Sequence, residues 1–242
     1  ALCQILPGPT STQTITAIGY KIGGPMLAYL TLAVWLFPAF IIMTTAGVIF
    51  SHLAVMEKSV EFTRIIQPMA VGFVAYAAYI ISSKIVKTYE AGAIMIISAI
   101  LSFILKSPYV FPVLLLGSGA LTAIKFNEQP REPHDKFKIN WSNFILWIAV
   151  FLVIAAVANI TKFLPLLLME NFYRNGSLIF GGGQVLIPLL YTEFVEFKNY
   201  LSSEEFLTGY AIVQAVPGPV FSFTSYIGAM SMREYGIGGE IL

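Results

Sequence analysis

The feature that most constrains this chain is a series of long segments without charged residues. No Asp, Glu, Lys or Arg occurs in residues 22–56, 65–83, 107–124, 139–161, 175–192 and 206–232. A helix needs about 20 apolar residues to cross the roughly 30 Å hydrocarbon core of a bilayer, and several of these segments reach that length. Charged residues make up only 11% of the chain, against about 25% in a typical soluble domain. The sequence therefore predicts an all-α, polytopic integral membrane protein.

The uncharged segments also predict the order of the spans. We expect membrane helices at residues 25–50 (kinked at Pro38), 65–83, 91–105, 108–124 and 142–160. Residues 163–192 hold two prolines and a glycine triplet, which favour two short segments over one clean span. The following residues, 193–205, are amphipathic and acidic, and we expect them at the membrane interface.

One motif interrupts the apolar segments twice. It reads "QILPGPTSTQ" at residues 4–13 and "QAVPGPVFSF" at 214–223, with Gln three residues before Pro-Gly-Pro in both copies. Proline breaks a helix because it lacks a backbone N–H and clashes with the preceding turn. Broken backbone is tolerated inside a membrane only where protein or water surrounds it. Paired breaks in two halves of a chain are typical of inverted-repeat transporters with one site near the midplane.

The two breaks predict a binding site for an anion. A helix that resumes after each break points its free N–H groups, and the positive end of its dipole, back into the break. The candidate binding residues of the two copies are Gln4, Pro7, Gly8, Pro9, Thr10, Ser11, Thr12 and Gln13, then Gln214, Pro217, Gly218, Pro219 and Ser222. The segment "FGGGQVLIPLL" adds Gly181, Gly182, Gly183 and Gln184 as an anion nest. The alternatives are packing kinks at the Pro-Gly-Pro turns and a glycine-rich helix-packing face.

Several other classes of protein are excluded by what the sequence lacks. A phosphate loop requires Gly-Lys-Ser/Thr after its glycines, and this glycine segment has neither that ending nor a dinucleotide-binding spacing. The single cysteine, Cys3, excludes an internal disulfide and a cysteine metal cluster. The longest polar loop, residues 125–138, mixes both charges, so a nucleic-acid partner is not expected. We therefore expect no cofactor, no metal and no enzymatic activity.

Several motifs in the same order resemble the chromate transporter family. They are "ALCQILPGPTSTQ", "GYKIGGP", "GSLIFGGGQVLIPLL" and "EEFLTGYAIVQAVPGPVFSF". Members of that family resemble two homologous halves of opposite topology, each with a Phe-Gly-Gly segment followed by Glu-Phe and the Gln/Pro-Gly-Pro motif. In the second half the Glu-Phe pair falls on Glu205 and Phe206. The matching elements of the first half would precede Ala1, so the resemblance implies a chain truncated at its N-terminus.

The resemblance implies a function and a division into repeats. Residues 1–124 would form the first transporter repeat, 125–141 a polar connecting loop, and 142–242 the second repeat. The implied function is secondary transport of chromate, or of a similar oxyanion such as sulfate, with export by alternating access in the cell membrane. The expected partners are the oxyanion and the lipid bilayer, and a homodimer is one assembly to consider. The alternative is an oxyanion channel or a non-transporting membrane scaffold built on the same repeats.

Energy coupling needs an ionisable group inside the helix bundle. The candidates are Glu170, Arg174 and Glu205. Alternatively, Glu170 and Arg174 form an interfacial pair, and Glu205 is a helix-start residue beside two serines. We expect the histidines, His52 and His134, to be solvated loop residues. The tryptophans Trp35, Trp141 and Trp147 are expected at the membrane interface or facing lipid.

Overall fold

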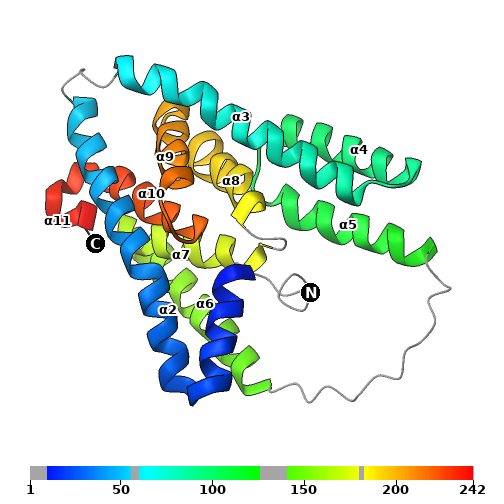
Figure 1. The fold of residues 1–242 in the computed structure, drawn as a ribbon, viewed down its shortest axis with the longest axis horizontal. Coiled ribbons are helices and arrows are strands. Elements are labelled where there is room, and N and C mark those ends of the chain that lie inside the picture. The colour runs from blue at the N-terminus through cyan, green and yellow to red at the C-terminus, as the bar shows by residue number, and fades with distance from the viewer. Residues whose placement is uncertain (1–9, 56–59, 126–140, 180–182, 242) are drawn as a thin grey trace. The chain divides into compact units, whose positions relative to one another are not determined.

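The computed structural model describes residues 10–55, 60–125, 141–179 and 183–241 of the 242-residue chain. Every element in these ranges is a helix (Figure 1). The chain divides into two compact units. Unit 1 comprises residues 1–87 and 175–242, and unit 2 comprises residues 88–174.

Within the described residues, three helices are long and apolar enough to cross a membrane. They lie in α2 (Thr10–Val55), α3 (Val60–Ile85) and α6 (Trp141–Thr161). Large apolar side chains cover the outside of the helices: Phe103 is 79%, Ile124 78% and Ile160 82% exposed. A soluble protein does not expose so much apolar surface, whereas a bilayer covers it. The prediction of an all-α polytopic membrane protein is confirmed.

Unit 2 contains the hairpin expected between residues 91 and 124. Its helices are α4 (Tyr89–Leu105) and α5 (Val110–Lys125), which contact each other. Thr88 caps the start of α4, and Lys106 ends it in a left-handed conformation with φ 42°. The unit continues through α6 into α7 (Leu164–Leu178), where the Tyr173 hydroxyl donates to the Trp147 carbonyl at 3.1 Å.

In unit 1, α2 is a hairpin of two helices rather than one straight rod. Its backbone leaves the helical region at Gly23 and Gly24, and Gly24 has φ 70° and ψ −163°. Only glycine adopts that conformation readily. A Cβ on Gly19 would lie 3.1 Å from the Ala28 Cα, so the two arms pack closely and run antiparallel. We call residues 10–22 the short arm and residues 25–55 the long arm (Figure 1, dark and mid blue).

The interruption of α2 therefore lies at the two glycines and not at Pro38. Pro38 lies within helical backbone of the long arm. Proline is tolerated inside membrane helices because neighbouring groups compensate for the missing hydrogen bond. A residue with positive φ, in contrast, cannot continue a helix at all.

Residues 163–192 form two short helices, as the sequence predicts. These are α7 and α8 (Gly183–Tyr191). A π-helical turn, η1 (Thr192–Phe197), follows directly and buries Glu193 completely. π-helical turns are rare and occur often at functional sites.

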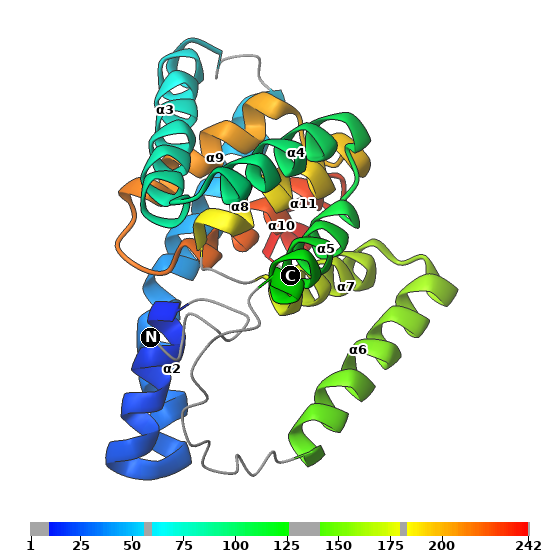
Figure 2. The same ribbon diagram turned by 90° about the vertical axis from the view of Figure 1, so that its right-hand side faces the viewer.

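The second Pro-Gly-Pro motif separates α9 (Ser203–Ala215) from η2 (Val220–Ser222) and α10 (Phe223–Ser231). α9 and α10 fold back on each other: the Phe206 and Phe223 rings are 4.9 Å apart, and the Tyr226 hydroxyl donates to the Glu205 carbonyl at 3.0 Å. With 13 and 9 residues, these helices are about 20 and 14 Å long, too short to cross the bilayer core singly. The motif is thus the tip of a helical hairpin (Figure 2).

Two short elements complete unit 1: η3 (Arg233–Tyr235) and α11 (Gly236–Ile241). α2 packs most extensively against α10 and also contacts α9 and α11. The fully buried core centres on α8, α9 and α10 and includes Leu190, Phe194, Phe206, Phe223 and Tyr226.

Candidate functional site

The break at the tip of the α9–α10 hairpin depends on one glycine. Gly218 has φ 145°, which side-chain-bearing residues rarely adopt. A Cβ built on it would lie 2.6 Å from the Ala39 Cβ on the long arm of α2. Both the backbone conformation and the close approach to α2 therefore require glycine at this position.

The start of α8 lies against the same break. Gly183 is the first residue of α8, and a Cβ there would lie 2.9 Å from the Val220 Cβ of η2. The glycine segment and the second Pro-Gly-Pro motif thus meet, as Figure 1 shows for the yellow and orange ribbons. Gly181 and Gly182 lie outside the described residues, and Gln184 is placed only as part of the α8 backbone.

The helices that follow the two Pro-Gly-Pro motifs run in opposite directions. α10 runs parallel to the long arm, because Gly218 lies at Ala39 and Ala229 lies at Gly47. The short arm, which follows the first motif, runs antiparallel to the long arm. The N-terminal ends of the short arm and of α10 therefore face each other.

Both helix starts lie at about the same level of the long arm. Thr10 precedes the end of the short arm by 12 residues, and Ala39 follows the start of the long arm by 14 residues. At about 1.5 Å per residue, these positions are about 18 and 21 Å from the glycine turn. Both views show the dark blue start of α2 in the same region as the orange break (Figures 1 and 2). Gln4, Pro7, Gly8 and Pro9 lie outside the described residues.

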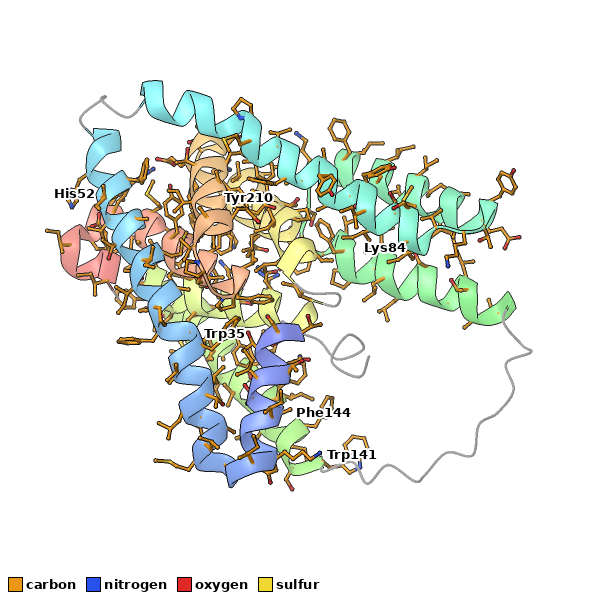
Figure 3. All side chains as sticks on the ribbon, viewed as in Figure 1. Trp35, His52, Lys84, Trp141, Phe144 and Tyr210 are labelled. Carbon is orange, nitrogen blue, oxygen red and sulfur yellow. The ribbon has the colours of Figure 1, made fainter. Side chains whose placement is uncertain are left out.

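Three hydrogen-bond donors around the break are buried without a partner. They are Ser222 Oγ, Thr12 Oγ1 and Trp35 Nε1. Ser222 is 6% exposed and lies within the break itself. Trp35, labelled in Figure 3, precedes Ala39 by one helical turn on the same face, and the register set by Gly19 and Ala28 puts Thr12 opposite it. A buried polar atom without a partner is costly, so these atoms indicate a bound water or ligand.

The other candidate residues surround the same place. Thr10, Ser11 and Gln13 occupy the first turn of the short arm with Thr12. On the second copy, Gln214 and Pro217 are exposed and Pro219 is buried. The Gln214 side chain forms a hydrogen bond with Tyr210, one turn earlier in α9. The described candidates from both breaks and from the glycine segment therefore all lie in unit 1.

Comparison with known proteins identifies the family. The chromate transporter family matches residues 1–123 and 166–242. This chain belongs to the chromate transporter family. The resemblance drawn from the motifs is confirmed, and the chain is an integral membrane protein of that family. No solved structure matches it.

Three curated relatives show the extent of the similarity. The chain is 28% identical to a probable chromate transport protein of Synechococcus elongatus over 94% of its own length and 56% of the relative's. It is 26% identical to a chromate transport protein of Cupriavidus metallidurans over 94% of its own length and 55% of the relative's. It is 28% identical to an uncharacterized transporter of Methanocaldococcus jannaschii over 100% of its own length and 59% of the relative's. The chain thus spans a little over half the length of the curated relatives it matches.

The two glutamates among the coupling candidates of this chromate transporter family member each form an ion pair with an arginine. In unit 2, Arg174 Nε lies 2.9 Å from Glu170 Oε1, and Arg174 Nη2 donates to Asn171 Oδ1 at 3.2 Å. In unit 1, Glu205 forms a capping box with Ser202 at the start of α9 and an ion pair with Arg233. Glu205 therefore lies at the base of the α9–α10 hairpin, at the end away from the tip. Glu170 and Arg174 form a pair, and Glu205 lies at a helix start beside two serines. The interfacial position of the pair and a coupling role for these residues stay predictions.

The contacts of Glu205 predict a stability defect. We expect Glu205→Ala to lower the melting temperature, because the variant loses the hydrogen bond from the Ser202 N–H to Glu205 Oε2 and leaves Arg233 without this ion-pair partner. That hydrogen bond alone is worth about 1 kcal/mol, or about 2–4 °C for a chain of this size. Melting of the detergent-solubilised protein measures the shift, with the exposed neighbour Glu204→Ala as the control. Equal melting temperatures for the two variants would show that the contacts of Glu205 with Ser202 and Arg233 do not stabilise the hairpin.

The sequence did not reveal an interaction at the other end of the long arm. His52 was expected in a loop but lies in the last turn of α2, 3.5 Å from Glu240 of α11. Trp35 was expected at an interface or facing lipid, yet its indole nitrogen is buried. Both residues depend on contacts with the second half of the chain or across the hairpin, which no local pattern encodes.

Proposed function

We propose that this protein is a secondary transporter for chromate or a similar tetrahedral oxyanion such as sulfate. The observation that carries the proposal is the buried, unpartnered Ser222 hydroxyl within the second break. It lies at the level where two helices of opposite direction begin. An oxyanion there accepts hydrogen bonds from the hydroxyl and from free backbone N–H groups of the helix starts.

The proposed site holds its anion with neutral donors. Residues 22–56 and 206–232 contain no Lys or Arg. Neither the long arm near Ala39 nor the break therefore supplies a positively charged side chain. The side-chain donors are Ser222 Oγ, Thr12 Oγ1 and Trp35 Nε1. Helix dipoles add positive potential from both directions. A dianion can therefore bind without the fixed cation that would slow its release, as a transport cycle requires.

A shared backbone feature supports two repeats of inverted topology. Each Pro-Gly-Pro motif is followed by a helix and then by a glycine of the same unusual conformation. Gly24 has φ 70° and ψ −163°, and Gly236 has φ 69° and ψ −174°. We assign residues 1–124 and 142–242 to the two repeats, with 125–141 connecting them. Rocking of one repeat against the other would expose the site to each side of the membrane in turn, with export as the proposed direction.

The Ser222 hydroxyl provides the test. We expect Ser222→Ala to weaken binding of chromate and sulfate by about 10- to 150-fold, because a hydrogen bond to a charged group is worth about 1.5–3 kcal/mol. Titration calorimetry of the purified protein measures the affinity. Ser231→Ala is the matched control, since Ser231 Oγ is also buried without a partner but lies at the opposite end of α10.

Two results would count against the proposal. Equal affinities for the Ser222 and Ser231 variants would move the anion site away from the break. Ohmic anion conductance in place of saturable uptake by proteoliposomes would favour the channel alternative.

A further inference from the structure

A buried carboxylate joins the C-terminal end of the long arm of α2 to α11. The side chain of Glu240 is 1% exposed. Its Oε1 accepts a hydrogen bond from Ser51 Oγ at 2.7 Å, and Ser51 is itself 1% exposed. Its Oε2 has no hydrogen-bond partner and lies 3.5 Å from His52 Nε2. The His52 side chain is 53% exposed, so the buried carboxylate is connected to the outside of unit 1 through the imidazole ring.

Glu240 differs in its partners from the two coupling candidates. Glu170 and Glu205 each pair with an arginine, which carries a permanent charge. Glu240 faces a neutral hydroxyl and a histidine, the side chain whose charge changes near neutral pH. An ionised carboxylate buried without a fixed cation is costly. Of these three glutamates, Glu240 is therefore the one whose carboxylate is buried without an arginine partner.

No other charged group on the described elements around α11 takes the place of His52. η3 contributes Arg233, which pairs with Glu205, and the exposed residues Glu234 and Tyr235. The titratable residue of α10 is Tyr226, whose hydroxyl donates to the Glu205 carbonyl. On the long arm, the groups at Glu240 are Ser51 and His52.

The position of this cluster links it to the anion site. Ser51 lies 12 residues after Ala39 on the long arm, and between them Gly47 packs on Ala229 of α10. α10 begins at the break and contacts both α2 and α11. Because α10 and α11 both pack on the long arm, the long arm connects the Glu240 carboxylate to the start of α10, where the oxyanion is proposed to bind.

We propose that Glu240 is the proton-binding site of this transporter, and that Ser51 and His52 hold its ionised form. This inference rests on the proposed transport function. With Glu240 ionised, its contacts fix α11 on the long arm and keep the helix starts assembled for the anion. A proton that binds Glu240 Oε2 through His52 breaks these contacts and weakens the anion site. Oxyanion binding then releases that proton through His52 to water, which gives exchange of oxyanion for protons.

Proton release on anion binding tests this proposal without a transport assay. Sulfate is added to the purified full-length protein in weakly buffered detergent solution with a pH indicator, while calorimetry reports sulfate binding in parallel. We expect wild type to release protons on binding. Glu240→Gln should bind sulfate but release none, and Glu234→Gln, an exposed neighbour on η3, should behave as wild type. His52→Gln should slow or reduce the release.

The outcomes separate this inference from the proposed function. Absence of sulfate and chromate binding by wild type would contradict the oxyanion site itself. Binding without proton release, proton uptake, or unchanged release in Glu240→Gln would overturn the role of Glu240 alone. Loss of release in Glu170→Gln or Glu205→Gln, with normal release in Glu240→Gln, would assign coupling to those residues instead. Ser51→Ala, which removes the hydroxyl beside Glu240 and no charge, provides a second test if Glu240→Gln does not fold.

Discussion

Gly218→Val should abolish oxyanion binding by the folded protein. Gly218 has φ 145°, and a Cβ added to it would lie only 2.6 Å from the Ala39 Cβ. A β-branched residue resists this backbone conformation and would push α2 away from the break. Several N–H groups at the start of α10 would then be misdirected together. The effect should therefore exceed the loss of one hydroxyl in Ser222→Ala, and calorimetric affinities for chromate and sulfate measure both.

Two further variants separate backbone conformation from packing. Gly72→Val on α3 is the control for adding a valine to a membrane helix, because a Cβ at Gly72 has nothing within 4 Å. The double variant Gly218→Ala with Ala39→Gly restores room at the contact but keeps an unfavourable φ. We expect it to bind weakly, since the conformation of the break sets the direction of the N–H groups. Wild-type affinity in a Gly218→Val protein with a normal melting temperature would show that the motif is only a packing kink.

The corresponding variant of the first motif, Gly8→Val, should weaken oxyanion binding as much as Gly218→Val if one dianion is held from both sides.

Much of the fold follows from physical rules that act within a few residues. A bilayer excludes charges and requires apolar helices, so the uncharged segments predicted the spans in α2, α3 and α6. Proline and glycine stop helices, so the sequence predicted a break at residues 217–219 and a helix start at Thr10. The division of residues 163–192 into two helices followed from the same rule.

The parts of the site that the sequence did not reveal depend on tertiary contacts. Gly23 and Gly24 turn the chain, and Pro38 does not, but composition alone cannot rank a glycine pair above a proline in a membrane helix. Glu240 and Ser51 are 189 residues apart in the chain and meet because α10 and α11 pack on the long arm. Trp35 has the sequence context of a lipid-facing residue. Its place beside the break is set by Ala39, one turn later, against Gly218.

Trp35→Phe should weaken oxyanion binding by about 10- to 150-fold, the value of one hydrogen bond to a charged ligand. Phenylalanine keeps an aromatic ring in the packed position but lacks the indole N–H. That N–H is buried without a partner on the face of α2 that carries Ala39. Tryptophan in a buried position normally finds a hydrogen-bond acceptor, and an oxyanion between the two helix starts supplies one.

The three tryptophans of the chain make this prediction easy to check. Trp141→Phe is the matched control, because Trp141 is 62% exposed on α6 in unit 2. A protein that keeps Trp35 and carries Phe at 141 and 147 should change its fluorescence when sulfate, which does not absorb in that range, is added. Normal sulfate affinity in Trp35→Phe, or no fluorescence change in the single-tryptophan protein, would remove Trp35 from the site. A defect confined to Trp35→Phe, with an intact melting temperature, would place the bound anion between the short arm of α2, its long arm and α10.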